Sequence, residues 1–485
     1  MHALYNLAAW MAQPLLRRKL AARARAEPLY GQWVAERFGH AYAAPAVLRE
    51  DEHPLWIHAV SLGETRAAAI LAQALRARRP GLRLLLTHGT ATGRAEGAKL
   101  LQAGDAQAWQ GLEATDLGAV VIKAAVERAG IAPDQVQEVL MGCVLPAGQG
   151  QAPARQATLK AGLPPSTGAT TLNKVCGSGM KAVMLAHDLI RAGSQDVVVA
   201  GGMESMSNAP YLVPKGRTGY RYGHGTLLDH MAYDGLEDAY SKMPNGGGKS
   251  MGLFAEDCAS KYHFTREAQD AYALESSRRA RTANEDGSFA WETVPVTIPG
   301  RKGDVVVERD ESPFKVDPSK IPNLRPAFVK DGTVTAATSS SISDGAAALV
   351  LMRQSEARKR GLTPIATLVA HATFSREPEW FTVAPVGAIE KVLAKAGWQT
   401  ASVDLYEINE AFAVVTMAAM KEHGIPHDKV NIHGGAVALG HPIGASGARV
   451  LVTLLGALKK TGGKRGVASL CIGGGEATAI AVEMA

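Results

Sequence analysis

At 485 residues the chain is long enough to bury more than one hydrophobic core, so we expect more than one domain. Its net charge of +6 is modest for this length, and no basic patch is interleaved with aromatic residues, which argues against a nucleic-acid partner. The four cysteines, Cys143, Cys176, Cys258 and Cys471, lie far apart and lack zinc-site spacing. This pattern disfavours a disulfide framework or a zinc site and indicates a reducing compartment, the cytoplasm.

The first segment, residues 1–25, is apolar up to Leu16 and then carries a cluster of arginine and lysine residues. The apolar stretch is too short and too interrupted to span a bilayer, and it lacks the features of a secretory signal. An apolar segment followed by basic residues is typical of a helix lying on the inner membrane surface, which predicts peripheral membrane contact. An amphipathic helix that covers a core explains the same pattern equally well.

Composition changes near Trp109, and from there on apolar segments of helical and extended character alternate. We expect helices over residues 117–129 and 180–192, and strands over residues 136–141 and 196–200. Such alternation predicts an α/β fold with a parallel or mixed sheet and crossover helices.

Four short motifs, each glycine-rich or turn-prone, together indicate a single active site. In chain order they are NKVCGSG (Asn173–Gly179), NEAFA (Asn409–Ala413), GHPIG (Gly440–Gly444) and CIGGG (Cys471–Gly475). Two cysteines, one histidine and one asparagine in such settings are what an enzyme that condenses thioesters needs.

We interpret Cys176 as a nucleophile, because a helix start offers free backbone N–H groups and a dipole that favour a thiolate. A small buried residue at a helix start is the alternative. His441 lies in a turn set by glycines and Pro442, and its imidazole can take the thiol proton. A turn histidine that faces solvent is the alternative there. His433, near a glycine pair, is better explained as structural.

The chain from about residue 111 onward resembles the thiolases, most closely the acetyl-CoA acetyltransferases. The resemblance rests on the four motifs and on residues 151–156, 200–206 and 332–336. It implies the thiolase fold, with two similar βαβαβαββ halves and an inserted loop domain that covers coenzyme A (CoA). The implied boundaries are residues 111–206 with 342–362 for the N-terminal half, 207–341 for the loop domain and 363–485 for the C-terminal half.

The same resemblance implies an acyltransferase of fatty-acid metabolism that condenses two acetyl-CoA to acetoacetyl-CoA and CoA, and catalyses the reverse thiolysis. Cys176 becomes acetylated, and Cys471 removes a proton from the second acetyl-CoA. Gly473 donates a backbone N–H to the thioester oxygen. Asn409 holds a water that, with His441, stabilises the enolate. No metal and no prosthetic group are implied, and the enzyme is expected to be a homo-oligomer.

Three further positions match CoA contacts of the family: Met251, Phe328 and Ser340. The first two would pack on the pantetheine or adenine, and the serine would donate or accept a hydrogen bond. Core packing and an ordinary turn serine remain open as alternatives. The chain has Thr338 and Ser343 in a stretch where the family often has asparagines, a departure that concerns the CoA pocket and not the reaction class.

Residues 1–110 resemble the N-terminal part of the bacterial 3-deoxy-D-manno-octulosonic acid (Kdo) transferase, an α/β glycosyltransferase. The matching stretches include residues 36–39, 56–65 and 90–94. Glu64 matches the family's general base, but we favour a structural carboxylate at a helix start. The sugar-nucleotide-binding half of that family has no counterpart here, so we expect no Kdo transfer.

The opening strand of the thiolase fold, which should precede residue 115, has no recognisable match. The chain thus looks like two truncated genes joined head to tail, or an error of assembly. Residues 84–87 read as a short strand that either belongs to the first piece, which we favour, or fills the vacant slot. Two other functional hypotheses therefore stay open: an inactive fused chain, and a glycosyltransferase-related protein at the membrane surface.

Overall fold

The computed structural model describes residues from 112 to the C-terminus, apart from 245 and 300–302; upstream it describes only residues 17–19, 21–25, 55–59, 68, 71 and 84–88. The chain divides into two compact units, residues 1–108 and 109–485. Glu64, residues 1–16 of the expected membrane-surface helix and residues 90–94 lie outside the described part of the chain.

In the first unit, β1 (Leu55–Ala59) and β2 (Leu84–His88) pair in parallel, with Leu55 opposite Leu84. The strand expected at residues 84–87 therefore forms, and its partner is β1, as the favoured interpretation had it. The basic cluster lies on two short helical stretches, residues 17–19 and 21–25. Among the described helices, none combines the length and the apolar character needed to cross a membrane.

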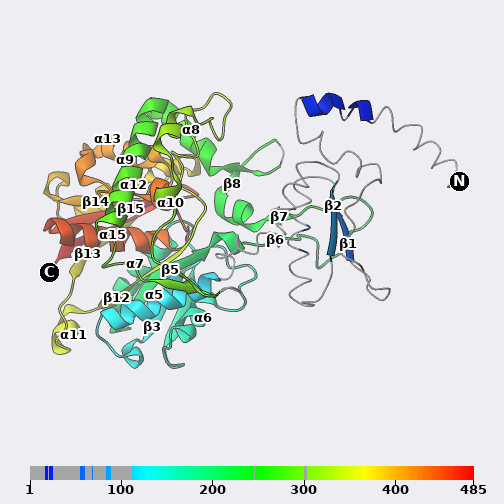
Figure 1. Ribbon diagram of the computed structural model, residues 1–485. Helices are drawn as coiled ribbons and strands as arrows, with labels where there is room; N and C mark the ends of the chain where they lie inside the picture. The colour runs from blue at the N-terminus through cyan, green and yellow to red at the C-terminus, as the bar shows by residue number, and fades with distance from the viewer. Residues whose placement is uncertain are drawn as a thin grey trace. The chain divides into compact units, whose positions relative to one another are not determined.

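The second unit contains two halves built on one plan (Figure 1). The first half comprises α5 (Ala114–Arg128), β3 (Glu138–Gly142), α6 (Pro153–Lys160), β4 (Gly168–Leu172), α7 (Ser178–Ala192), β5 (Val197–Ser205) and β12 (Asp344–Met352). The second comprises β13 (Ala366–Ser375), α12 (Ala384–Ala396), β14 (Leu405–Ile408), α13 (Ala413–His423), α14 (Ala436–Leu439), α15 (Ser446–Thr461), β15 (Arg465–Ile472) and β16 (Glu476–Met484). The helices and strands expected after Trp109 correspond to α5, β3, α7 and β5.

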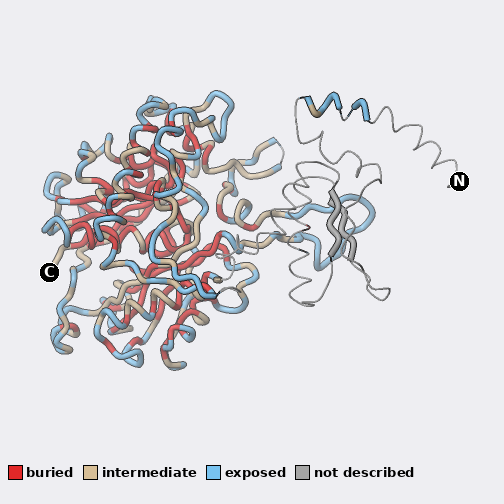
Figure 2. The backbone as a smooth tube through the Cα atoms, viewed as in Figure 1, coloured by how far each residue is buried: buried red, intermediate tan, exposed pale blue. Residues whose placement is uncertain are grey.

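The two sheets face each other across a layer formed by α7 and α15. Their strand orders are β12-β5-β3-β4 and β13-β16-β15-β14. Side chains alternate along β3: Leu140 joins the core with α7 and α15, whereas Val139 and Met141 join the core with α5 and α6. Both faces of the sheet are thus covered, which explains the nearly continuous apolar strands. In Figure 2 the buried residues of this unit follow these layers.

Between β5 and β12 the chain makes a long insertion. It contains β6 (Tyr211–Leu212), β7 (Leu228–Asp229), β8 (Glu237–Lys242), β9 (Gly248–Ser250), α8 (Met251–Tyr262), α9 (Arg266–Glu285), β10 (Val296–Ile298), β11 (Val305–Val307) and α10 (Ser312–Lys315). α8 and α9 both pack on α13 of the second half. The insertion therefore lies against the elements that carry the NEAFA motif.

The two sheets differ at one edge. β16 pairs with β15 on one side and with β13 on the other, whereas β12 pairs with β5 and, among the described residues, with no second strand. Accordingly, most residues of β12 are half-buried, while the middle of β16 is buried. In the second half, β13 directly precedes α12; the equivalent place before α5 lies outside the described residues. Among the described residues, the outer edge of β12 is therefore unpaired, at the place where the expected opening strand would lie.

Candidate active site

The four motifs lie at the ends of elements that meet between the two halves. Cys176 lies directly before α7, Asn409 directly after β14, and His441 between α14 and α15, while Cys471 is near the end of β15. The start of α7 contacts the GHPIG turn: a Cβ on Gly179 would lie 3.1 Å from the carbonyl oxygen of Gly444. A side chain there would separate the two motifs.

Cys176 follows a residue with an unusual backbone. Val175 has φ of 45°, a left-handed conformation that a β-branched residue rarely adopts. Its N–H donates to Asn173 Oδ1 (3.0 Å), and its carbonyl accepts from the hydroxyl of Ser178 (2.7 Å). The same Ser178 oxygen accepts the N–H of Lys174 (2.8 Å). Backbone strain of this kind persists where neighbouring bonds enforce it, and it is typical of functional sites.

Cys176 is half-buried as a residue, and its thiol lies against the backbone of Gly473 in the CIGGG turn. Burial by the surrounding protein raises its pKa to about 11, more than the backbone of Gly473 lowers it. This is opposite to the expectation that the helix start would favour a thiolate. In the free protein Cys176 is therefore a thiol that needs a base.

His441 has a ring nitrogen that can accept a proton. Its Nδ1 lies 2.6 Å from Ser446 Oγ, and the hydroxyl of Ser446 donates to the carbonyl of Pro442 at 3.0 Å. Because that hydroxyl proton is already used, Ser446 accepts Nδ1–H, and Nε2 keeps its lone pair. Nε2 is buried and has no partner within the described structure. Burial, helped by the charge of Arg449, lowers the His441 pKa to about 3, so the ring is neutral.

Asn409 is oriented by a buried ion pair. Its Oδ1 accepts a hydrogen bond from Arg449 (3.4 Å), which also contacts the carboxylate of Glu407 at 3.2 Å. The Asn409 amide nitrogen therefore faces away from Arg449, and it is buried without a partner among the described residues. Asn409 does not cap α13, because the N-cap of that helix is Phe412.

Cys471 is fully buried and close enough to Cys176 that a charge on the latter raises its pKa. Burial is the larger cause of this shift and holds the Cys471 pKa well above its usual range. Two thiols, one neutral imidazole and one amide nitrogen thus occupy a single region. Such a set can form an acyl-thioester on one sulfur and move a proton with the other.

The three positions expected to contact CoA lie beside these motifs. Met251 begins α8, and its sulfur would be 3.5 Å from a Cβ on Gly473. Phe328 is 36% exposed and meets the ring of Phe412 edge-on, with centroids 6.0 Å apart. Ser340 donates its hydroxyl to the carbonyl of Ala411 (3.0 Å). The structure therefore brings all the predicted site residues into contact with the four motifs.

One residue of the site was missed by the sequence argument. Glu204 lies in the stretch 200–206 and is fully buried at the end of β5. Its carboxylate accepts backbone N–H groups of Val144 (2.9 Å), Leu145 (3.1 Å) and Gly444 (2.9 Å). Burial raises its pKa to about 7. The available signal in the sequence was a carboxylate within an apolar strand. The role of Glu204 is to hold the GHPIG turn.

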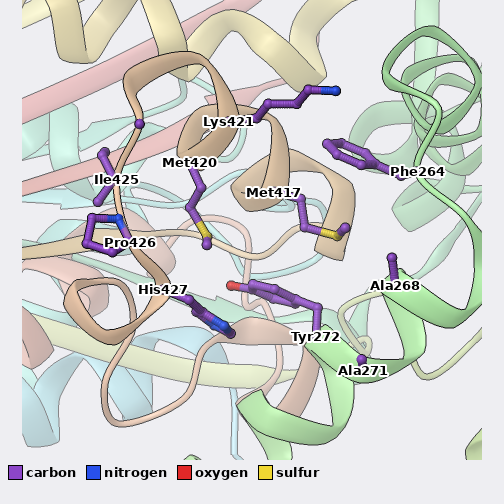
Figure 3. A pocket seen from close by; sticks show the side chains of 11 residues that line it. Phe264, Ala268, Ala271, Tyr272, Met417, Met420, Lys421, Ile425, Pro426 and His427 are labelled. Carbon is purple, nitrogen blue, oxygen red and sulfur yellow. The ribbon is translucent and has the colours of Figure 1, made fainter.

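Two other features lie apart from this site. His433 packs edge-on against Phe289, and burial lowers its pKa to about 4, which agrees with a structural role. A hollow between α9 and α13 is lined by Tyr272, Met417 and Met420, among others (Figure 3). None of the predicted site residues lines this hollow.

Comparison with known proteins assigns the chain to a family. Residues 98–355 match the family model of the thiolase N-terminal domain, and residues 362–484 match that of the thiolase C-terminal domain. The chain belongs to the thiolase family and has the thiolase fold. Residues 32–131 also match the family described as 3-deoxy-D-manno-octulosonic-acid transferase (kdotransferase). The overlap, residues 98–131, includes α5, which packs on β5 and β12 of the second unit.

Individual relatives agree with this family assignment. The chain is 52% identical over 376 residues to acetyl-CoA acetyltransferase 2 of Arabidopsis thaliana, covering 77% of this chain and 92% of that protein. It is 51% identical over 374 residues to acetyl-CoA acetyltransferase of Chromobacterium violaceum, covering 77% and 94%. The crystal structure of Acat5 thiolase from Ascaris suum in complex with coenzyme A superposes with a TM-score of 0.72 at 44% identity, covering 77% and 94% of the two chains.

Proposed function

We propose that this protein is an acetyl-CoA C-acetyltransferase that condenses two acetyl-CoA to acetoacetyl-CoA and CoA and catalyses the reverse thiolysis. The observation that carries the proposal is the proximity of the Cys176 and Cys471 thiols, together with a neutral His441 whose Nε2 is buried with a free lone pair. Relatives with this name are about half identical to the chain over most of their length.

In the first step, His441 Nε2 accepts the proton of the Cys176 thiol, and the thiolate attacks the carbonyl carbon of acetyl-CoA. The C–S bond to CoA breaks, and the leaving thiolate of CoA takes the proton from His441. Base catalysis is required because the Cys176 pKa is about 11, far above neutrality. The product is an acetylated Cys176, so the kinetics are ping-pong.

In the second step, His441 Nε2, free again once CoA has left, takes the proton of the buried Cys471 thiol, and the Cys471 thiolate then accepts a proton from the methyl carbon of a second acetyl-CoA. The resulting enolate attacks the acetyl group on Cys176. The new carbon–carbon bond forms, the bond to the Cys176 sulfur breaks, and acetoacetyl-CoA leaves. The proton on His441 passes to the Cys176 sulfur when the product leaves. The free amide nitrogen of Asn409 and the backbone N–H of Gly473 act as donors where negative oxygen develops.

The CoA moiety is proposed to bind over Met251, Phe328 and Ser340. Two of these offer apolar surface and the third a hydroxyl, which suits a long, mostly apolar pantetheine arm. The reaction needs no metal and no prosthetic group, with CoA serving only as the carrier of the substrates. The domain division proposed is residues 1–110, 111–206 with 342–362, 207–341 and 363–485, in support of which β5 ends at Ser205 and β13 begins at Ala366.

We further propose that the enzyme is a cytoplasmic homo-oligomer and that residues 1–25 contact the inner membrane peripherally. Five cations on the helical stretches 17–19 and 21–25 support attraction to an anionic surface. Co-sedimentation of the full chain with anionic vesicles tests this. We expect binding to the vesicles to be lost when Arg17, Arg18 and Lys19 are changed to Ala together. Binding by that variant equal to that of the wild type would exclude the membrane contact.

Thiolysis of acetoacetyl-CoA by the purified full chain tests the function. We expect CoA-dependent loss of acetoacetyl-CoA in the wild type and none above background in Cys176→Ala. Cys258→Ala is the matched control, because Cys258 is a buried thiol outside the four motifs. A folded, soluble wild type without activity would instead favour the inactive fused chain.

A further inference from the structure

Three polar side chains form a cluster where the two halves of the thiolase fold meet, away from the four motifs. His187 and Asp188 lie on α7, whose start follows Cys176, and His371 lies on β13 of the second half. His371 Nε2 is 2.9 Å from Asp188 Oδ1, and His187 Nδ1 is 3.2 Å from the same oxygen. The two rings meet edge-on with centroids 5.0 Å apart.

This arrangement has the donor set of a metal site. One nitrogen from each imidazole and one carboxylate oxygen lie within 4.8 Å of one another. Tetrahedral Zn²⁺ holds such ligands at about 2.0–2.2 Å, which places neighbouring ligand atoms about 3.4 Å apart. The separations of 2.9 and 3.2 Å therefore need only a small opening to admit the ion.

The surroundings leave the ligands available. The two histidine side chains are mostly covered (16% and 15% exposed), whereas Asp188 is 52% exposed, so the carboxylate side is open to an entering ion and to a water as fourth ligand. The nearby cation of Lys395 is held by the carbonyl oxygen of His371 (3.0 Å) and not by its ring.

We propose that His187 Nδ1, Asp188 Oδ1 and His371 Nε2 form a zinc site that joins α7 of the first half to β13 of the second. The site is structural and takes no part in the proposed reaction. A bound ion links the two halves through the helix that carries Cys176 at its start. It also replaces two hydrogen bonds to one carboxylate oxygen with three metal–ligand bonds.

Binding of the metal alone to the full chain tests this inference. Co²⁺ serves as the probe, since a tetrahedral Co²⁺ site absorbs visible light. We expect one Co²⁺ per chain, displaced by Zn²⁺, without the charge-transfer absorption that a thiolate ligand would add. His187→Ala and His371→Ala should each weaken binding at least tenfold, while His224→Ala, at an exposed histidine, should bind as the wild type.

Thermal unfolding gives a second readout that is independent of activity. Excess Zn²⁺ should raise the unfolding temperature of the wild type and of His224→Ala, but not of the two ligand variants. If either histidine variant does not fold, Asp188→Asn, which keeps the shape of the side chain, carries the same test. Wild-type affinity in the ligand variants, a thiolate band, or no bound metal at saturating Co²⁺ would overturn the site.

Discussion

At the scale of single residues, the protonation states follow from burial and not from sequence position. The NKVCGSG motif and its predicted helix identify Cys176, and the GHPIG turn identifies His441. The sequence does not reveal that burial keeps the first a thiol and the second a neutral imidazole. Those states depend on burial by the folded protein and on side chains outside the motifs, such as Arg449 and Glu204.

The hydrogen bond from His441 to Ser446 leads to the first prediction. Ser446→Ala removes the acceptor that fixes Nδ1–H, so Nε2 is less often the free base. We expect kcat for thiolysis to fall about tenfold to 100-fold, a part of the roughly 10²–10⁴-fold that base catalysis supplies. Ser194→Ala, at an exposed serine just after α7, is the control. An unchanged kcat in Ser446→Ala would show that this bond does not set the base.

A second prediction concerns the CoA contact at Phe328. Its ring is partly exposed and lies edge-on to Phe412 of the NEAFA motif. Phe328→Ala should raise KM for acetoacetyl-CoA by up to about tenfold with little change in kcat, because an aromatic contact is lost equally from substrate and transition state. Steady-state kinetics with Phe314→Ala, a similarly exposed ring elsewhere in the insertion, provide the comparison. Equal KM values in both variants would place CoA elsewhere.

At the scale of elements, the sequence predicted α7 and α5 well and their exact ends less well. α5 begins at Ala114, before the expected residue 117, because Glu113 and Asp116 form a capping box, with a 3.0 Å bond from the Glu113 N–H to Asp116. Within the described part of the chain, β12 has no partner on its outer edge, where the sequence offered no recognisable opening strand. This difference in strand pairing becomes clear only when β12 is compared with β16, the equivalent strand of the other half.

Hydrogen exchange tests this edge directly. In β16 both rows of amides face a partner strand, whereas in β12 alternate amides face away from β5. We expect the outward amides of Asp344–Met352 to exchange faster than those of Glu476–Met484, measured residue by residue in the full chain. Equal protection of the two strands would mean that another segment covers the edge of β12.

A buried carboxylate near α15 makes stability depend on pH. Oε2 of Glu292 is buried with no partner in the described structure, and burial raises the Glu292 pKa from 4.5 to about 8. A raised carboxyl pKa favours the folded state at low pH, and this contribution is lost as pH rises from about 4.5 through 8.

Glu292→Gln removes that titration. The unfolding temperature of the wild type should therefore fall more steeply between pH 5 and pH 8 than that of the variant, by about 2 °C or more. Glu285→Gln, at an exposed carboxylate on α9, should keep the wild-type slope. Parallel slopes for wild type and Glu292→Gln would contradict the raised pKa.

At the scale of the whole molecule, the chain combines a unit that matches the Kdo-transferase family with a thiolase unit. Every residue of the proposed active site comes from the second unit. A chain that begins at Trp109 should therefore keep the thiolysis activity of the full chain to within about threefold, measured on soluble protein of equal concentration. Loss of activity with retained folding would show that the first unit contributes to the site.

The central claim is that Cys176 forms the covalent intermediate of a thiolase, and intact-protein mass spectrometry tests it most directly. The full chain is mixed with acetyl-CoA and quenched in acid, its intact mass is measured, and it is then digested to locate the added group. We predict one added acetyl group, located on the peptide that contains Cys176, and none in Cys176→Ala. Cys471→Ala should still become acetylated but should form no acetoacetyl-CoA, because it lacks the second base. Acetylation of Cys471 in the wild type, or no acetylation of a folded chain, would contradict the assignment.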